Sequence, residues 1–386
     1  MASGVAAPAL IAPIVGQWAV ASRWAVAPAA PGAVVGGGSR ALVGRRLLPI
    51  RRSAAASSAA GGRLAAVSAT PAGVSDVASI QAAVLTWYAS NGRSLNFRRR
   101  RDAYSVLVSE TMAQQTQISR VEPAWEAFLA RFPTVQALAA APPADVLRAW
   151  QGMGYNRRAL NLQRAARMIV ATFGGVVPGS VEALERLPGV GPYTARAVAA
   201  IAFGQPVGAV DTNVRRVLGR VGGGWSGIAA RELQALADAV VPAGRAGEWT
   251  HALMDIGARY CRPHVPACPD CPVRAHCIAA GEAAPGPSRP AVDGHRQGLP
   301  TAGRTAGRAV GRAVPSRRVP FRETSRWLRG RIVDRARAAE ADDWVRIDGP
   351  WESHAETAVH LAVRGLAAEG LLEIHPTDPA LMRLPR

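Results

Sequence analysis

The sequence predicts a mostly α-helical protein, and three observations support that prediction. Hydrophobic residues recur at helical spacing from Val77 to about Ala258. Within this region, the segment LPGVG at residues 187–191 separates two helical patterns, as a tight turn between helices would. All four cysteines follow directly after the helical region, between residues 261 and 277. With 386 residues, the chain can hold one or two sizeable domains.

The charge composition favours a nucleic-acid partner. The formal net charge is +19, and all 46 basic residues are arginine, so the chain contains no lysine. Strongly basic chains favour polyanions, above all nucleic acid. The clustered cysteines indicate a metal site and argue against a disulfide-stapled secreted fold. No segment is a convincing transmembrane helix, so we expect a cytoplasmic, nucleoid-associated protein without a membrane partner.

Residues 1–75 are expected to form a disordered basic tail. They contain seven arginines, no acidic residue and long Ala/Gly/Pro/Ser runs, which cannot bury a core. The uncharged run at residues 1–22 lacks the basic start of a signal peptide and contains Pro8 and Pro13. An organelle transit peptide and a mis-assigned start are the alternatives that stay open. Asp76 or Ser79 can then cap the first helix.

The segment at residues 187–191 predicts a hairpin between helices over Val181–Arg186 and Thr194–Phe203. Its glycines, Gly189 and Gly191, tolerate the positive φ values that such a turn needs. The second helix would begin with unpaired backbone N–H groups, which suit a phosphate. Taken alone, a GxG hairpin is better interpreted as an αα-corner without a ligand.

The residues after the hairpin extend its pattern. A Gly/Pro-containing loop, residues 204–210, leads to Asp211 at the start of a helical pattern over Thr212–Arg220. The stretch 187–211 resembles the helix-hairpin-helix and Gly/Pro-Asp signature of the base-excision DNA glycosylases. The resemblance implies a domain of two helical subdomains at residues 76–280. It also implies that Gly189, Gly191 and Arg215 lie at the DNA.

Glu110 is the expected general acid. Val106 and Leu107 lie one turn before it, so its carboxyl shares a partly apolar helix face, which should raise its pKa. An exposed helical glutamate is the alternative. The run ETMAQQTQ at residues 110–117 resembles the MutY-type adenine glycosylases, which implies that Glu110 protonates the leaving base and Gln115 wedges into the base stack. Ala113 stands where that family usually has leucine, which weakens part of the wedge.

Two further segments are expected at the DNA. The run WQGMGYNRRALNLQRAA at residues 150–166 resembles the family segment whose tyrosine inserts beside the base opposite the target, which implies that role for Tyr155. Packing in the core is the alternative for a single tyrosine. Arg98 begins a run of four arginines, residues 98–101. Such a run is usually a solvated face, but beside a DNA-binding motif phosphate contact is an equal alternative.

The cysteines Cys261, Cys268, Cys271 and Cys277 have the spacing C-x6-C-x2-C-x5-C. Four thiolates suit zinc or a four-iron cluster, and the number of ligands does not separate them. The spacing resembles that of the 4Fe-4S cluster loop in the endonuclease III and MutY families. The resemblance implies a structural 4Fe-4S cluster that closes a basic loop at the DNA.

The carboxyl-terminal part is expected to contain a linker and a small module. Residues 281–318 are rich in Pro, Gly and Arg and lack periodicity, which indicates a linker. In residues 319–386, helices are predicted at Trp327–Ala339 and Glu356–Glu369 and a strand at residues 371–374, which suits a winged-helix-like module. An inert packing appendage is the alternative. The Nudix-like domain that many MutY-type enzymes carry is not evident.

The expected chemistry is hydrolysis of an N-glycosidic bond by a monomeric enzyme. By analogy with glycoside hydrolysis, Glu110 would protonate the leaving base, and Asp211, held as an anion by a helix dipole, would stabilise the sugar cation. Asp211 as a helix cap alone is the alternative. Bifunctional relatives need a lysine after the hairpin, where this chain has Tyr193. The resemblance implies double-stranded DNA with A:G or A:8-oxoguanine mispairs as substrate; a mismatch thymine glycosylase and a non-catalytic DNA-binding relative are the alternatives.

Overall fold

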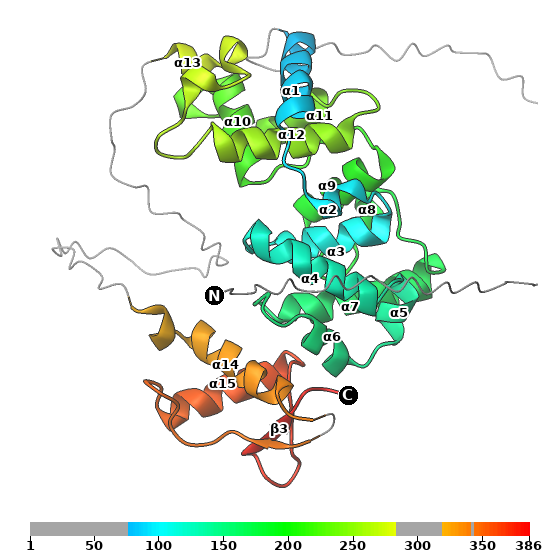
Figure 1. Cartoon of the computed structure of the whole chain (residues 1–386), viewed down its shortest axis with the longest axis vertical. Coiled ribbons are helices and arrows are strands. Elements are labelled where there is room, and N and C mark those ends of the chain that lie inside the picture. The colour runs from blue at the N-terminus through cyan, green and yellow to red at the C-terminus, as the bar shows by residue number, and fades with distance from the viewer. Residues whose placement is uncertain (1–75, 283–318, 341–342) are drawn as a thin grey trace, which may run out of the picture. The chain divides into compact units, whose positions relative to one another are not determined.

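The computed structural model describes residues 76–282, 319–340 and 343–386 (Figure 1). The expectations for the basic tail at residues 1–75 and for most of the linker fall outside these ranges. Within them the chain is mostly helical, as predicted. The helices are α1 (Val77–Asn91), α2 (Asn96–Arg99), α3 (Ala103–Ala113), α4 (Ile118–Arg131), α5 (Val135–Ala140), α6 (Pro143–Ala149), α7 (Arg157–Phe173), α8 (Val181–Glu185), α9 (Pro192–Phe203), α10 (Thr212–Gly223), α11 (Ala230–Ala239), α12 (Ala246–Arg259), α13 (Ile278–Gly281), α14 (Ser325–Arg337) and α15 (Glu356–Ala368).

The helical region is built around two hydrophobic clusters, which correspond to the two predicted subdomains. The first cluster contains buried residues of α3 to α9 and continues into α14 and α15, with Phe128 and Trp150 among its largest side chains. The second contains residues of α1, α10, α11 and α12, including the fully buried Trp249. The chain therefore begins in one subdomain, builds the other, and then returns to the first (Figure 1).

Short polar side chains define where several helices begin. Asp76 caps α1 by accepting a hydrogen bond from the backbone N–H of Ser79 at 3.0 Å, so Asp76 and not Ser79 is the cap. Asp102 caps α3 in the same way through the N–H of Ser105 at 2.9 Å. These bonds satisfy backbone donors that the first turn of a helix leaves unpaired.

The predicted hairpin between α8 and α9 is present, and its two glycines have different roles. Gly189 has φ +80°, and a Cβ at this position would lie 2.7 Å from the Cβ of Asn161. Gly191 has φ −94° and open space around a built Cβ, so it does not need the conformation that we expected of both glycines. Gly191 is instead the residue before α9, whose first position is proline.

The carboxyl-terminal module is winged-helix-like, as predicted. Helices α14 and α15 pack with a three-stranded antiparallel sheet of order β1-β3-β2, formed by Val345–Arg346, Leu381–Arg383 and Glu373–Ile374. Met382 on the central strand pairs with Val345 on one side and Ile374 on the other. The strand β1 between the helices was not predicted, because a strand of two residues has no detectable alternation. The expected strand at residues 371–374 is limited to its last two residues.

In the described parts of the chain, no helix is both long enough and apolar enough to cross a membrane.

Candidate active site

One large cavity of about 1,850 Å³ brings most of the predicted functional residues together. Its lining includes all the predicted catalytic and DNA-binding residues except the two hairpin glycines, namely Arg98, Glu110, Gln115, Tyr155, Tyr193, Asp211 and Arg215. These side chains come from helices of both subdomains and from the loops before α4 and α7. Gly189 and Gly191 are exposed, and Gly189 lies against Asn161, which does line the cavity.

Glu110 is a buried carboxyl group held by a tyrosine. It lies near the end of α3 with 7% of its surface exposed, and the hydroxyl of Tyr193 donates to its Oε2 at 2.8 Å. Burial raises the pKa of Glu110, and the charge of Asp211 raises it further. The hydrogen bond from Tyr193 and the positive charge of Arg98 act in the opposite direction without overcoming burial. The carboxyl is therefore suited to hold a proton, as predicted.

Tyr193 remains a hydrogen-bond donor. Burial and the neighbouring carboxylates raise its pKa well above the ordinary value. A phenol in this environment keeps its proton and donates a hydrogen bond to Glu110. Tyr193 lies at the start of α9, immediately after the hairpin and Pro192. The hairpin therefore places the hydroxyl that holds the Glu110 carboxyl.

Asp211 both caps α10 and faces the cavity. Its Oδ1 accepts from the backbone N–H of Val214 at 2.7 Å, and its Oδ2 accepts from Nδ2 of Asn213 at 2.9 Å. The two interpretations that the sequence left open, a cap and a functional carboxylate, are thus compatible in one side chain. Glu110 and Asp211 enter the cavity from different subdomains, and the charge of Asp211 contributes to the raised pKa of Glu110.

Arg98 differs from the exposed phosphate contact that we expected. Its side chain is 8% exposed, and its guanidinium donates through both Nη atoms to the buried carboxylate of Asp255 on α12, at 2.8 and 2.9 Å. Arg93 donates to the same carboxylate from its backbone N–H at 2.9 Å and from Nε at 2.6 Å. A bidentate pair of this kind is a fixed part of the wall, not a solvated charge. The next three arginines of the run, residues 99–101, are exposed.

His251 was not singled out by the sequence. It lies on α12 with 8% of its surface exposed and lines the cavity close to Arg98. Burial, and then the positive charge of Arg98, lower its pKa to about 3. The imidazole is therefore neutral at physiological pH. Burial has the opposite consequence for Glu110, because it favours the protonated form of a carboxyl group.

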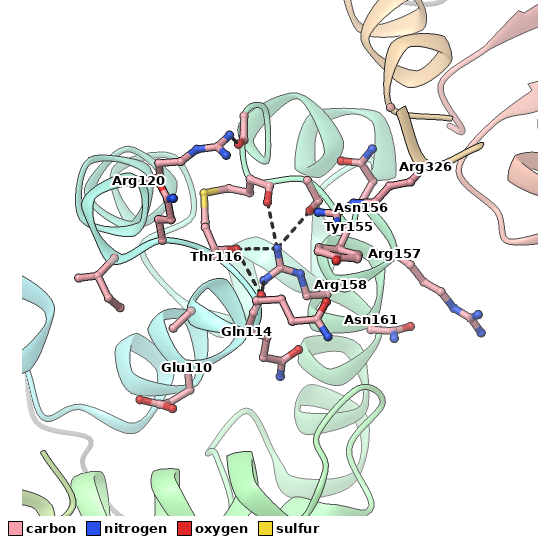
Figure 2. A pocket seen from close by; sticks show the side chains of 18 of the residues that line it. Glu110, Gln114, Thr116, Arg120, Tyr155, Asn156, Arg157, Arg158, Asn161 and Arg326 are labelled. Atoms are coloured by element: carbon pink, nitrogen blue, oxygen red, sulfur yellow. Dashed lines mark hydrogen bonds between the residues drawn. The ribbon is translucent and has the colours of Figure 1, made fainter. Parts of the chain in front are cut away.

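The two predicted wedge residues share an uncommon backbone conformation. Gln115 has φ +54° and Tyr155 has φ +46°, and both side chains are exposed. Left-handed conformations of non-glycine residues are costly and persist only where the surrounding structure enforces them. Figure 2 shows Tyr155, Gln114 and Thr116 around the guanidinium of Arg158.

Arg158 enforces both loops, and sequence reasoning missed it. Its guanidinium donates to three carbonyl oxygens at the end of α3 and to two in the loop before Tyr155. The acceptors are the carbonyls of Thr111 (2.8 Å), Met112 (3.0 Å), Gln114 (2.7 Å), Met153 (3.1 Å) and Gly154 (3.2 Å). It therefore joins the segment that carries Glu110 and Gln115 to the segment that carries Tyr155. Nothing in the run of two arginines, Arg157 and Arg158, indicated which side chain turns inward.

The four cysteines line a second, smaller cavity beside α10. Its apolar wall includes Val217, Val221 and Val273, and Nη1 of Arg220 lies 3.4 Å from the Sγ of Cys261. None of the four cysteines forms a disulfide. Across the ranges that the structure describes, no three His, Cys, Asp or Glu side chains are arranged to hold a metal ion.

The fold and the paired acidic residues define a class of protein. A helix-hairpin-helix leads to an aspartate that caps the next helix and shares a cavity with a buried glutamate of raised pKa. This arrangement defines a helix-hairpin-helix DNA glycosylase. Residues 108–243 match the family model described as HhH-GPD superfamily base excision DNA repair protein. A solved structure described as a thermostable thymine-DNA glycosylase is 30% identical, with a TM-score of 0.50, over 52% of this chain and 95% of that one.

Relatives in sequence define the family more narrowly. Adenine DNA glycosylase of Mycolicibacterium smegmatis is 46% identical over 197 residues, which cover 50% of this chain and 67% of that protein. The protein of the same name from Mycobacterium tuberculosis is 39% identical over 262 residues, covering 67% and 78%. The human one is 41% identical over 219 residues, covering 53% and 40%. The chain belongs to the MutY-type adenine DNA glycosylase family.

Proposed function

We propose that this protein is a monofunctional, monomeric base-excision repair enzyme that removes adenine mispaired with guanine or 8-oxoguanine in double-stranded DNA. The observation that carries the proposal is the buried Glu110, whose pKa is raised by burial and which is held by Tyr193, in one cavity with Asp211. The relatives named adenine DNA glycosylase support adenine as the base that is released. Genomic DNA in the cytoplasm is the expected substrate.

The reaction breaks the bond between a base nitrogen and C1′ of the sugar. Adenine is a poor anionic leaving group, so Glu110 transfers its proton to a ring nitrogen of the base as the bond breaks. The electron pair of the bond leaves with the base, and the sugar becomes an oxocarbenium-like cation. Asp211 stabilises that cation and assists the incoming water, which adds to C1′ and loses a proton. The products are free adenine and an abasic site.

The target adenine must leave the helix before this chemistry. Extrusion of a base costs a few kcal/mol, and side chains that occupy the vacated space reduce that cost. Gln115 and Tyr155 are the side chains proposed for this role, because both are exposed at the cavity and both are fixed through Arg158. The exposed Arg215 on α10 is proposed to contact a phosphate near the hairpin.

The reaction is proposed to stop at the abasic site. Lyase activity of related enzymes requires an amine that attacks C1′ and forms a Schiff base. The chain contains no lysine, and Tyr193 occupies the corresponding position. Borohydride should therefore trap no lysine-linked complex with abasic DNA.

The four cysteines are proposed to hold a 4Fe-4S cluster. The donor set fits, because four thiols and no other metal-binding side chain line one mostly apolar cavity next to α10. Cys261, Cys268, Cys271 and Cys277 would bind the irons, and the cluster would supply a cross-link within the loop and no step of the reaction. Purified protein should then be brown and contain iron in excess of zinc. A colourless, anaerobically prepared protein with one zinc per chain would contradict the proposal.

The proposed function is tested by single-turnover release of the base from A:G, A:8-oxoguanine and T:G duplexes. Wild type should release adenine from the first two and no thymine from the third. Glu110→Gln and Asp211→Asn should each reduce adenine release about 10²-fold or more, with DNA affinity largely retained, because neither change removes a phosphate contact. Release of thymine at a comparable rate would favour the mismatch thymine glycosylase. Absence of any base release would favour the non-catalytic alternative.

A further inference from the structure

The carboxyl-terminal module contributes a side chain to the wedge. Arg326, on the first turn of α14, places its guanidinium carbon 4.1 Å from the ring centroid of Tyr155. The guanidinium carbon of Arg158 lies 5.6 Å from the same centroid. Tyr155 is thus contacted by one arginine of its own subdomain and one from the module, which Figure 2 shows beside it.

The module is anchored close to this contact. Arg337, at the other end of α14, is buried; its Nε donates to the carbonyl of Leu147 at 2.9 Å and its Nη2 to Oδ1 of Asn156 at 2.7 Å. The backbone N–H of Ala144 donates to the carbonyl of Pro385 at 2.9 Å. The module therefore forms hydrogen bonds with α6 at Ala144 and Leu147 and with Asn156, the residue next to Tyr155. These bonds fix the position of α14 relative to Tyr155.

The charge of Arg326 is available to this contact. No ion pair or hydrogen bond links the Arg326 side chain to an acidic group in the described ranges, whereas Arg329 on the same helix pairs with Glu369 at 2.8 Å. A guanidinium over an aromatic ring is attracted by the ring quadrupole, and its planar shape also suits stacking among bases. Arg326 also lines the cavity that contains Glu110 and Asp211.

We propose that Arg326 is a positioning residue for Tyr155, so that the carboxyl-terminal module helps to recognise the base opposite the target. The stack restrains the Tyr155 ring in the orientation that enters the helix. This inference rests on the proposed function, because it assigns Tyr155 to the base opposite adenine.

Binding of a mispaired duplex gives the first test. Arg326→Ala should weaken binding of an A:G duplex about fivefold, which is the range of a partly exposed cation–π contact. Arg331→Ala is the control, because Arg331 lies on the same helix and lines the same cavity but pairs with Asp334 at 3.6 Å instead of stacking on the Tyr155 ring. Arg326→Lys should recover part of the loss, since lysine keeps the charge without the planar stack. Equal losses for Arg326→Ala and Arg331→Ala would overturn the proposal, because they would show a general charge effect.

A double-mutant cycle and a fluorescent base separate positioning from independent phosphate contact. Adding Arg326→Ala to Tyr155→Ala should cost nothing further, because Arg326 acts through the ring. Additive losses would overturn the proposal. A 2-aminopurine placed beside the opposite base should brighten on binding to wild type and less with Arg326→Ala. An unchanged signal with Arg326→Ala would likewise overturn the proposal.

The single-turnover rate of wild type on the A:G duplex tests the proposed function separately. Wild type should release adenine whatever the binding measurements show for Arg326→Ala, so a failure of those measurements would overturn the role of Arg326 and not the proposed function. Loss of adenine release by wild type itself would instead contradict the proposed function.

Discussion

Glu110 and Tyr193 form a hydrogen-bonded pair in which the tyrosine lowers the pKa of the glutamate. The phenol hydrogen bond lowers the pKa of a carboxyl that burial raises, so the two effects partly cancel. A general acid works only while it holds its proton, and the rate therefore falls as the pH rises through its pKa. The strength of the Tyr193 bond thus helps to set the upper pH limit of the reaction.

Tyr193→Phe should move that limit to higher pH. Removing the hydrogen bond takes away a contribution that lowers the pKa of Glu110, so the carboxyl stays protonated at more alkaline pH. Single-turnover adenine release measured from pH 5 to pH 10 should show its alkaline limb displaced upward relative to wild type. Asn213→Ala, which removes a neighbour of Asp211 and no bond to Glu110, is the control. A displacement to lower pH with Tyr193→Phe would contradict this account of the pair.

The residue types at the site could be predicted, but several of their partners could not. Glu110, Asp211 and Tyr193 stand in segments that resemble a known family over many consecutive positions, so their shared cavity was expected. Arg98 was expected to be exposed because its partner, Asp255, lies 157 positions later, and no local sequence pattern predicts an ion pair at that separation. Arg326 was missed for the same physical reason, since it reaches Tyr155 from the other side of the linker.

At the scale of the elements, two loops depend on one guanidinium. Arg158→Met should leave five backbone carbonyls without their donor and cost about 3 kcal/mol of unfolding free energy, because a buried charged donor is lost. It should also weaken binding of mispaired DNA, since Gln115 and Tyr155 lose their shared support. Urea denaturation and duplex binding measure the two effects. Arg157→Met changes the exposed neighbour and should alter stability by about 0.5 kcal/mol at most.

The hairpin offers a test with a built-in control. Gly189→Ala introduces a Cβ at φ +80° and 2.7 Å from Asn161, which should cost about 1–2 kcal/mol and weaken DNA binding. Gly191→Ala places its Cβ in open space at φ −94° and should change the unfolding free energy little. Thermal unfolding of both variants decides the matter. Equal losses would mean that the strained turn is not what distinguishes the first glycine.

The bounds of the elements illustrate which patterns carry information. The helices predicted at Val181–Arg186 and Thr212–Arg220 correspond to α8 and α10 within a few residues, because caps and glycines mark their ends. The short strand β1 has no such signal in the sequence. Its existence depends on pairing with β3, 35 or more positions later in the chain.

At the scale of the whole molecule, the opposite base should be distinguished weakly. Tyr155 and Gln115 belong to the catalytic domain, and one hydrogen bond to a neutral group is worth about 0.5–1.5 kcal/mol, or roughly tenfold at most. Single-turnover rates on A:8-oxoguanine and A:G duplexes should therefore differ by about tenfold or less. A preference of several hundredfold that Arg326→Ala abolishes would assign the discrimination to the carboxyl-terminal module.

The return of the chain to its first subdomain has a consequence for synthesis. Of the helices in the described ranges, α1 leaves the ribosome first, yet Gln81 on α1 donates to the carbonyl of Val240, 159 positions later. At about 5–20 residues per second, α1 waits roughly ten seconds or longer for the helices that bury Ile80, Val84 and Leu85. Helices α3 to α9 can meet one another earlier. Nascent chains stalled with residue 210 outside the ribosome should therefore resist protease across residues 103–203 while α1 is still cut.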